Sequence, residues 1–568
     1  MSNSKIIMKT LKYRICFAAL VGMSLTACKK DFLQTTPTDR LSGSSITTDT
    51  SLFEDYVLNR YLGVTLQSKE GDGSPPGFGR GFEYAMWSSV TDESIYTNND
   101  GSWVLQQGQL AADNLGIAGT LWARSYRSIR ECNYALSLIN GLSLSAAHKT
   151  RLVGELEFIR AFRYQDLIRN YGGVVLMGDK VTDLNSNLQD PSLFKRATLA
   201  ESFSYVTAQL NDAASKLPSN NDGTWALGRA TKGAALALKS RLLLYAASPL
   251  YNTGSWSDAA AAAKAVMDLN KYQLDQNGYS QLFLTPSSDE IIFERLYYPN
   301  TAPHTRLEIA NGPNGYDGWG GNTPLQNIVD AYEMNNGKAI SDPTSGYDAQ
   351  DPYVNRDPRF YATILYNKAP YRGSTVDVFL PGGKDSNQGP SNWNTSLTGY
   401  YLRKFMNDAY PIDNPWSVAG AQPWIYFRYA EILLNYAEAQ NEAAGPDATV
   451  YAAINSIRAR SSVNMPALPA GLTQAQMRTA IQSERQIELA FEEHRFYDVR
   501  RWKIADQTEN VPAYGMSVTV NAAAPSGYTY TQKVALTGRA FQAKHYWLPI
   551  PLAEIQASNG QLTQNAGY

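Results

Sequence analysis

The strongest constraint on the fold is a helical pattern of apolar residues that recurs along the chain. In the segment 425–444, apolar side chains follow the i, i+3, i+4, i+7, i+8 spacing of one helix face: Tyr429, Ile432, Leu433, Tyr436 and Ala437. Gly445-Pro446 ends this run, and a second helical segment, 448–460, follows it. Because an apolar stripe must be buried against another element, the sequence predicts a body of packed helix pairs.

Four further segments have the same period and end at clear breakers: Leu121–Leu138, Lys149–Asn170, Lys232–Ala247 and Trp256–Leu269. Paired helices with small residues at their crossings resemble tetratricopeptide repeats, which have a period of about 34 residues. The pairs do not follow one another in tandem here, so no regular superhelical array follows from the spacing alone. The expected fold is mainly α, with helical regions at 51–295 and 424–568.

A loop-rich region, 296–423, separates the two helical regions. It holds 13 Gly in 128 residues and has little periodicity. Long loops in an ordered protein usually carry function. We therefore expect a helical scaffold that carries a long, loop-rich, ligand-binding insertion.

The N-terminus has the features of an export signal. A basic stretch precedes the apolar segment Ile15–Ala27, whose 13 residues are fewer than the roughly 20 needed to span a bilayer. The segment ends in Leu25-Thr26-Ala27-Cys28, which resembles a bacterial lipobox; an ordinary signal peptide with a chance cysteine is the alternative. We expect residues 1–27 to be removed, Cys28 to carry lipid, and residues 28–50 to form a tether.

Charge and cysteine usage exclude several classes of protein. The chain has 50 Lys plus Arg against 52 Asp plus Glu, so nucleic acid is not an expected partner. After processing, Cys16 is lost with the signal peptide and Cys28 carries lipid, so Cys132 is the only free thiol and no internal disulfide is expected. The four His are scattered and no zinc-ligand spacing exists. No cofactor or metal is expected, although structural calcium stays open because carbonyl and carboxylate ligands leave little sequence trace.

Several motifs resemble the SusD/RagB family of outer-membrane nutrient-binding lipoproteins of the Bacteroidetes. The matching segments are Arg428–Ala439, Glu484–Trp502, Leu548–Pro551 with Glu554-Ile555, the ending Gln564–Tyr568, and upstream Thr91–Glu93 and Arg160–Tyr164. Two positions depart from the family pattern, which often has Gly where Glu493 stands and Pro where Ala566 stands. Together with the lipobox, the resemblance covers nearly the whole processed chain.

The resemblance implies a lipid-anchored protein on the surface of the outer membrane. Such a protein binds an oligosaccharide or polysaccharide and delivers it to a SusC-like TonB-dependent transporter, without catalysis. Two alternatives in the same setting are a peptide- or other nutrient-binding lipoprotein and a surface glycosidase. A pure interaction scaffold without a ligand groove is the third.

The acidic residues near the C-terminus have two interpretations. Glu484, Glu488 and Glu492, followed by Glu493, have the i, i+4, i+8 spacing of one helix and could be read as paired catalytic carboxylates. The favoured interpretation is a structural ion network that joins the last helix to the scaffold. Its expected countercharges are the nearby arginines: Arg485, Arg495, Arg500 and Arg501. No Gly-x-Ser-x-Gly elbow or phosphate-binding loop is present.

The tryptophans divide by their surroundings. Five lie in helices or C-terminal motifs and are expected in the core: Trp122, Trp256, Trp424, Trp502 and Trp547. Six lie among Gly, Asn, Ser and Pro: Trp87, Trp103, Trp225, Trp319, Trp393 and Trp416. A sugar ring stacks its C–H face on an aromatic plane while polar side chains bond its hydroxyls, although such tryptophans can also pin loops to a scaffold.

The glycine-dense window 311–322 is the best candidate for a binding loop, because glycine permits close approach of a ligand. The expected contacts in it are Trp319, Tyr316 and Asn322. The residues after Asp92-Glu93 form the second window, with Tyr96, Asn98 and Trp103. Trp393 completes the predicted site.

Overall fold

The structure is a computed structural model that describes residues 46, 49–61, 85–182, 185–221, 223–298, 306–390, 392–410, 412 and 420–568. The predicted signal peptide, Cys28 and Trp416 lie outside these residues. The chain forms two units, 1–56 with 141–143 and 57–140 with 144–568. Helix α3 (Thr50–Leu58), of which residues 50–56 belong to the first unit, begins where the Asp49 carboxylate accepts the Ser51 N–H at 2.9 Å. The second unit contains the helical array, the insertion and the C-terminal segment.

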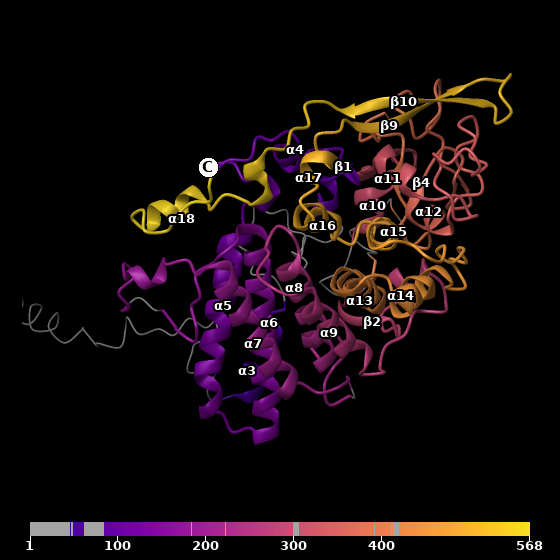
Figure 1. The fold of residues 1–568 in the computed structure, drawn as a ribbon. Coiled ribbons are helices and arrows are strands. Elements are labelled where there is room, and N and C mark those ends of the chain that lie inside the picture. Colours follow the sequence, from indigo (N-terminus) through magenta and orange to yellow (C-terminus); the bar gives the residue numbers. More distant parts are fainter. Residues whose placement is uncertain are drawn as a thin grey trace, which may run out of the picture. The chain divides into compact units, whose positions relative to one another are not determined.

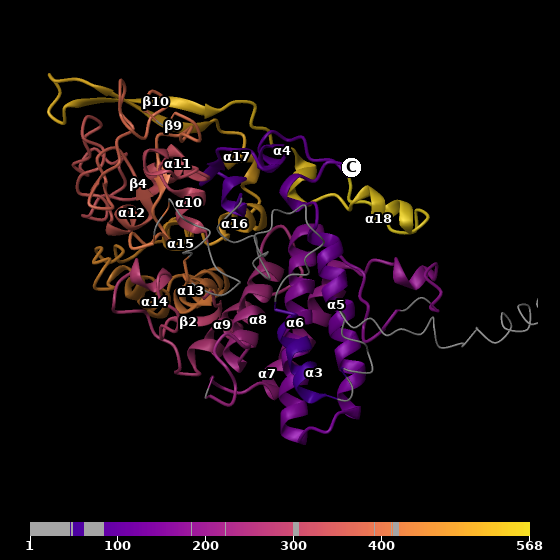
Figure 2. The ribbon, with the colours of Figure 1, turned by 180° about the vertical axis from the view of Figure 1, so that it is seen from behind.

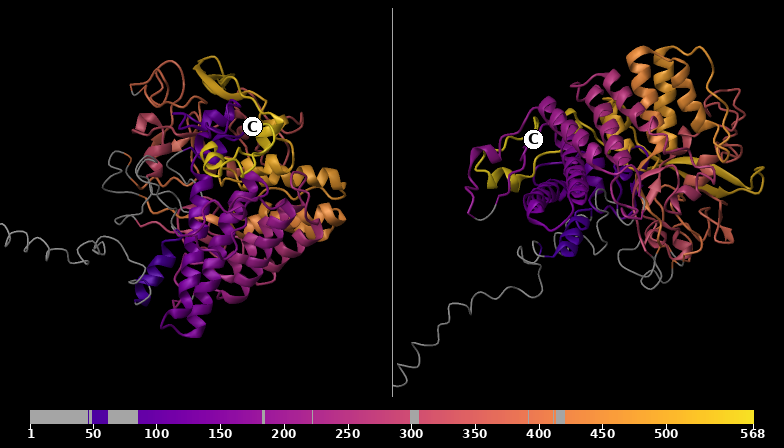
Figure 3. Two further views of the ribbon diagram at one scale, coloured as in Figure 1. Left: turned by 90° about the vertical axis from the view of Figure 1, so that its left-hand side faces the viewer. Right: turned by 90° about the horizontal axis from the view of Figure 1, so that it is seen from below.

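An array of helices forms the scaffold (Figures 1 and 3). Its members are α5 (Leu121–Leu138), α6 (Ala146–Tyr171), α7 (Leu199–Lys216), α8 (Lys232–Ala247), α9 (Trp256–Met267), α13 (Tyr429–Ala444), α14 (Ala448–Arg458) and α15 (Gln474–Glu488). Each helix from α5 to α9 packs on the next, α9 packs on α13, and α13 packs on both α14 and α15. The array is therefore continuous in space although residues 268–428 interrupt it in sequence. The prediction of a mainly helical protein built from tetratricopeptide-like pairs is confirmed.

Local sequence signals fix the helix ends. Capping boxes open α7 at Thr198 and α15 at Thr473, where each hydroxyl accepts the N–H three residues later. Gly172 ends α6 with a φ of 82° and Gly445 ends α13 with a φ of 87°, a region that favours glycine. The bounds of α5 and α8 are those predicted from the sequence.

The predicted helix over 425–444 is wrong in its first turn. Trp424–Arg428 is a strand, β8, paired antiparallel with β2 (Ile291–Arg295), and α13 begins only at Tyr429. The aromatic and β-branched run at the start of this segment favours a strand once a partner is available. Arg295 and Trp424 are register partners, so the strand pair closes the loop-rich region at its base.

In its described residues, the insertion between β2 and β8 contains short elements only. Its helices are α10 (Leu307–Asn311), α11 (Gln326–Ala331) and α12 (Pro358–Thr363). Its strands are β3 (Asn322–Pro324), β4 (Ile364–Leu365), β5 (Pro370–Tyr371), β6 (Ser374–Thr375) and β7 (Tyr401–Leu402). β4 pairs with β7 and β5 with β6, whereas β3 pairs outside the insertion with β1 (Ser94–Tyr96), which precedes α4 (Ser102–Gln106).

A C-terminal β-hairpin was not foreseen, because residues 424–568 were expected to be helical. After α16 (Arg495–Arg501) and α17 (Ala505–Thr508), β9 (Ala513–Val520) pairs with β10 (Tyr528–Leu536). Figure 2 shows this hairpin lying along the insertion, where Leu380 donates its N–H to the Val518 carbonyl at 2.8 Å. The alternation of Thr, Tyr and Val in these strands is the strand signal that sequence reasoning missed.

The C-terminal segment after the hairpin contains helix α18 (Leu552–Ala557). Residues on both sides of this helix form hydrogen bonds with the C-terminal end of α6. The Asn565 amide donates to the carbonyls of Tyr171 at 3.1 Å and Leu548 at 2.7 Å. Leu548 in turn donates its N–H to the Asn170 carbonyl at 2.8 Å. The C-terminal motifs therefore have a structural role.

The acidic residues of the second motif do not share one helix. Glu484 and Glu488 lie on α15, but the helix ends at Glu488, and Phe491 and Glu493 have φ values of 62° and 63°. Glu492 therefore lies in a turn between α15 and α16. The prediction of an i, i+4, i+8 row is wrong at this residue.

A buried ion network nevertheless joins these carboxylates to other elements. Glu488 accepts from Arg359 of α12 at 3.0 Å, Arg428 of β8 at 2.7 Å and Arg460 at 3.1 Å. Lys404 of the insertion donates to Glu492 at 2.7 Å. These cations lower the pKa of both glutamates against the effect of burial, which raises it. The network is structural, as predicted, and it ties the insertion to the helical array.

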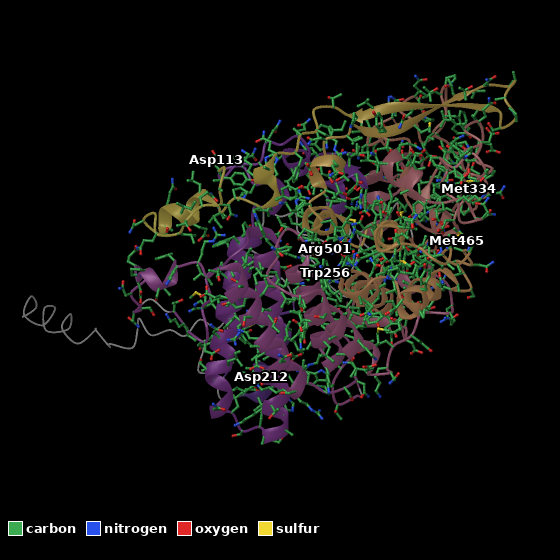
Figure 4. The ribbon with its side chains drawn as sticks, viewed as in Figure 1. Asp113, Asp212, Trp256, Met334, Met465 and Arg501 are labelled. Carbon is green, nitrogen blue, oxygen red and sulfur yellow. The ribbon has the colours of Figure 1, made fainter. Side chains whose placement is uncertain are left out.

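The arginines expected to supply the countercharges have other partners. Arg485 pairs with Asp498 at 2.8 Å, Arg495 pairs with Asp92 at 2.7 Å, and Arg500 lies over the Phe496 ring at 3.6 Å. Arg501, which is fully buried and is labelled in Figure 4, pairs with Asp498 and Glu438. Sequence proximity misled here because the helix breaks between α15 and α16.

Candidate ligand-binding site

Pairing of β1 with β3 brings the two predicted binding windows together. Tyr96 and Asn322 are register partners, and Thr97 donates its N–H to the Gly321 carbonyl at 2.9 Å. The windows 96–103 and 311–322 therefore share one strand pair although they are far apart in sequence.

Glycines fold the 311–322 window tightly on itself. A Cβ at Gly318 would lie 2.1 Å from the Gly312 carbonyl oxygen, so no other residue fits there. Trp319 donates its backbone N–H to the Ile309 carbonyl at 2.7 Å. The Trp319 side chain is partly exposed on this fixed loop.

The loop that carries Trp393 lies against the same window. Gly320 has a φ of 51°, and a Cβ there would lie 2.7 Å from the Asn394 carbonyl oxygen. Trp393 is 59% exposed, and Asn98 is exposed as well. The structure thus brings Trp319, Trp393 and Asn98 onto adjoining loops, which we call the aromatic platform.

Two predicted contacts are structural instead. Asn322 is fully buried, and its side-chain oxygen accepts the Met86 N–H at 2.9 Å and the Ser89 hydroxyl at 2.7 Å. Tyr96 is 6% exposed, and its ring lies where a side chain on Gly321 would clash. The expectation that these two side chains contact a ligand is wrong, because the strand pair that joins the windows buries both.

The side chains of Tyr316 and Trp103 are only partly available for contact with a ligand. The Tyr316 hydroxyl donates to the Thr375 carbonyl at 2.9 Å and accepts from the Lys384 ammonium at 2.9 Å. The Trp103 indole N–H donates to the Tyr96 carbonyl at 3.0 Å. Both side chains are partly exposed, so their ring surfaces, and not their polar atoms, remain for a ligand.

Two other loop tryptophans belong to the core. Trp87 is 4% exposed with its ring 4.5 Å from that of Phe496, and Trp225 is 1% exposed beneath the Arg229 guanidinium. Each of them pins a loop to the scaffold. Of the five tryptophans expected in the core, Trp122, Trp424 and Trp502 are buried, whereas Trp256 and Trp547 are partly exposed.

A pocket of about 110 Å³ opens between the insertion and the β9–β10 hairpin. Its walls combine apolar side chains such as Leu397 and Met516 with hydroxyl groups, one carboxylate, Asp385, and one ammonium, Lys533. Asp385 accepts the N–H of Gly315 at 3.0 Å and that of Asp377 at 2.8 Å, and burial raises its pKa to about 6. The hairpin residues of this pocket were absent from the sequence-based site.

No cluster of three or more His, Cys, Asp or Glu side chains able to hold a metal ion occurs in the part of the chain that the structure describes. Within the same ranges, no helix has both the length and the apolar character needed to cross a membrane.

The packing of the helical array and the loops mounted on it place the chain among helical-repeat proteins of tetratricopeptide-like architecture. A family model described as "SusD family" matches residues 275–568, and one described as "Starch-binding associating with outer membrane" matches residues 80–244. The chain belongs to the SusD family.

Relatives and solved structures agree with this assignment. "SusD-like protein P2" of Formosa agariphila is 23% identical over 472 residues, which cover 80% of this chain and 82% of the relative. A SusD-like protein of Bacteroides fragilis NCTC 9343 is 29% identical with a TM-score of 0.76, covering 94% of this chain and all of that one. A second protein of that strain, described as a SusD-like carbohydrate binding protein, is 26% identical with a TM-score of 0.77, covering 91% and 100%.

Proposed function

We propose that this protein captures an oligosaccharide or polysaccharide at the cell surface and passes it to a SusC-like TonB-dependent transporter of the outer membrane. The observation that carries the proposal is the aromatic platform, where Trp319 and Trp393 reach solvent on loops that hydrogen bonds and close backbone contacts hold in place. Fixed aromatic planes beside polar groups suit the apolar faces and hydroxyls of sugars. The carbohydrate binding described for the 26%-identical relative supports the same ligand class.

The proposed capture is non-catalytic. A glycosidase needs two carboxyl groups flanking the scissile bond. Among the residues that the structure describes, Asp385 is the only carboxylate that lines the pocket beside the platform, and each of its oxygens accepts a backbone N–H. Glu484, Glu488 and Glu492 are buried and paired with cations. The family and its relatives are described as binding proteins.

We further propose that lipid on Cys28 holds the protein at the outer membrane, with residues 28–50 as the tether. The lipobox resemblance supports the anchor, and the description of the matched family as associating with the outer membrane supports the location. We propose that the anchored protein faces the outside of the cell, so that the platform meets glycans in the surroundings.

Calorimetric titration of the chain beginning at Lys29 tests the proposal. The panel contains starch, laminarin, galactan and xylan oligosaccharides, and a set of peptides. We expect glycan binding that weakens about five- to 150-fold in Trp319→Ala and Trp393→Ala, since losing an aromatic anchor costs about 1–3 kcal/mol. Trp256→Ala is the matched control, because Trp256 is also partly exposed but starts α9 in the scaffold (Figure 4).

The outcomes separate the alternatives. If the protein binds peptides and no glycan, its ligand class is peptides instead of glycans. If it cleaves any glycan of the panel, the non-catalytic assignment is rejected. Normal binding by both platform variants would reject the site. Failure of the lipidated chain to co-purify with any SusC-like transporter from outer membranes of its own organism would reject the delivery step.

A further inference from the structure

We propose that the pocket between the insertion and the hairpin receives an anionic substituent of the captured glycan, a carboxylate or a sulfate, with Lys533 as its countercharge. This inference rests on the proposed glycan capture and names the chemical class of the ligand. Four features of the pocket support it: within the described residues its ammonium has no ion-pair partner and several of its hydrogen-bond donors have no acceptor, its carboxylate already accepts two backbone N–H groups, and it lies close to Trp393.

Lys533 is unpaired within the described residues, where it makes neither an ion pair nor a side-chain hydrogen bond. The cations next to the insertion side of the pocket have other partners: Lys384, which precedes Asp385, donates to the Tyr316 hydroxyl at 2.9 Å, and Lys368 pairs with Asp377 at 2.8 Å. The Lys533 side chain is exposed overall, but neighbouring protein atoms displace part of the water around its ammonium group. This partial desolvation lowers the pKa of Lys533. A partly desolvated cation without a partner is stabilised by an incoming anion.

The geometry of the hairpin places this ammonium beside the insertion. Lys533 stands opposite Gly515 in the strand register. A Cβ at Gly515 would lie 2.4 Å from the Thr398 carbonyl oxygen, so glycine lets the 395–399 loop lie directly on the hairpin. Met516 holds the loop there by donating its N–H to the same carbonyl at 2.7 Å.

Other pocket residues can donate hydrogen bonds to an anion. Thr395, Ser517 and Asn387 line the pocket and make no side-chain hydrogen bond with any residue in the described part of the chain. Hydroxyl and amide donors around an ammonium match the several acceptor oxygens of a carboxylate or a sulfate.

The acid in the pocket does not neutralise Lys533. Both Asp385 oxygens accept backbone N–H groups, from Gly315 and Asp377, and no ion pair joins Asp385 to Lys533 in the described residues. The charge of Lys533 is therefore left for a ligand.

The pocket lies within reach of a sugar on the platform. Thr395 follows Trp393 by two residues, so their Cα atoms are at most about 7 Å apart. A substituent on the sugar stacked at Trp393, or on its neighbour, can therefore enter the pocket.

The test uses matched probes on the chain beginning at Lys29. Each neutral hexose oligosaccharide of the panel, from starch, laminarin or galactan, is compared with its C6-oxidised form, which carries a carboxylate, and its 6-O-sulfated form. We expect at least one charged form to bind about tenfold more tightly than its neutral parent, with a preference that shrinks in about 1 M NaCl. Comparing the two charged forms distinguishes a uronate from a sulfate receptor.

Variants assign the preference to Lys533. Lys533→Gln should reduce the ratio of charged to neutral affinity to about one, whereas Lys533→Arg should retain it. Lys264→Gln is the matched control, because it removes the same charge from an exposed position on α9. Thermal melts establish that each variant is folded.

Two results overturn this inference alone: equal binding of neutral and charged forms by the wild type, or an unchanged ratio in Lys533→Gln. Absence of binding to every member of the panel would overturn the proposed glycan capture as well, so the two failures are distinguishable.

Discussion

Replacing Glu488 by glutamine is expected to destabilise the protein by about 3–5 kcal/mol, the cost of breaking one buried ion pair. Glu488 is fully buried and accepts from three guanidinium groups, those of Arg359, Arg428 and Arg460, at 2.7–3.1 Å. Glutamine keeps the shape, but its amide N–H₂ would face one or more of these donors. The cost stays near that of a single pair because other carboxylates still contact the same arginines.

The pH dependence of this effect has a defined sign. The arginines hold the pKa of Glu488 below its ordinary value of 4.5. As the pH falls below 4.5, the unfolded chain takes up the proton first, so the stabilisation by Glu488 declines toward its lower folded-state pKa. The advantage of the wild type over Glu488→Gln should therefore be complete near pH 7 and smaller near pH 3.5.

Urea unfolding followed by circular dichroism at pH 7 and pH 3.5 measures the loss of unfolding free energy in Glu488→Gln and its change with pH. The shift in the urea midpoint is converted to a free energy with the same m-value for the wild type and the variant. Asp268→Asn is the control, since Asp268 pairs with Lys264 on the surface, and it should change the free energy of unfolding by less than about 1 kcal/mol. A loss below 1 kcal/mol in Glu488→Gln at pH 7, or a loss that grows on acidification, would refute the assignment of Glu488 as a buried, ionised network residue.

Three further outcomes are expected. Trp502→Ala should lower the free energy of unfolding by about 3–5 kcal/mol, because it empties a core position and removes the indole N–H donated to Glu438 at 2.7 Å. Denaturant unfolding that matches the wild type would contradict this prediction. In the chain beginning at Lys29, Cys132 should resist a thiol reagent until the protein unfolds, since burial raises its pKa to about 11; stoichiometric labelling of the folded protein would argue against it. Cys28→Ala should release the protein from outer-membrane fractions, measured by detergent partitioning in cells that lack the transporter, and retention there would reject the lipid anchor.

The sequence predicted the helical scaffold well because its signals are local. Apolar periodicity, glycine and proline breakers and capping residues act within one helix, and the bounds of α5 and α8 follow from them. The predictions that proved wrong depend on distant partners. Residues 425–428 form a strand because Ile291–Arg295 pairs with them. Glu492 lies beyond the end of α15, where it forms an ion pair with Lys404 of the insertion.

The candidate site could be predicted only in outline. Glycine density located the 311–322 window, and the structure joins it to the 96–103 window. Which side chains face solvent depends on that pairing, which buries Asn322 and leaves Trp319 accessible. Lys533 could not be assigned to the site from the sequence, because its place there depends on the hairpin docking against the insertion.

The pairing of β2 with β8 affects how the loops of residues 296–423 can change in length and sequence among related proteins. The two strands hold the ends of residues 296–423 together, so the entropy of closing so long a segment depends only weakly on its length. Changes in the length and sequence of these loops therefore leave the helical array intact, and a new ligand preference can arise without a new scaffold. Arg359 and Lys404 limit this freedom, because each supplies a buried cation to the carboxylates at the end of α15. A chimera that exchanges the segment between relatives should fold only when both cations are present in the transplanted loops.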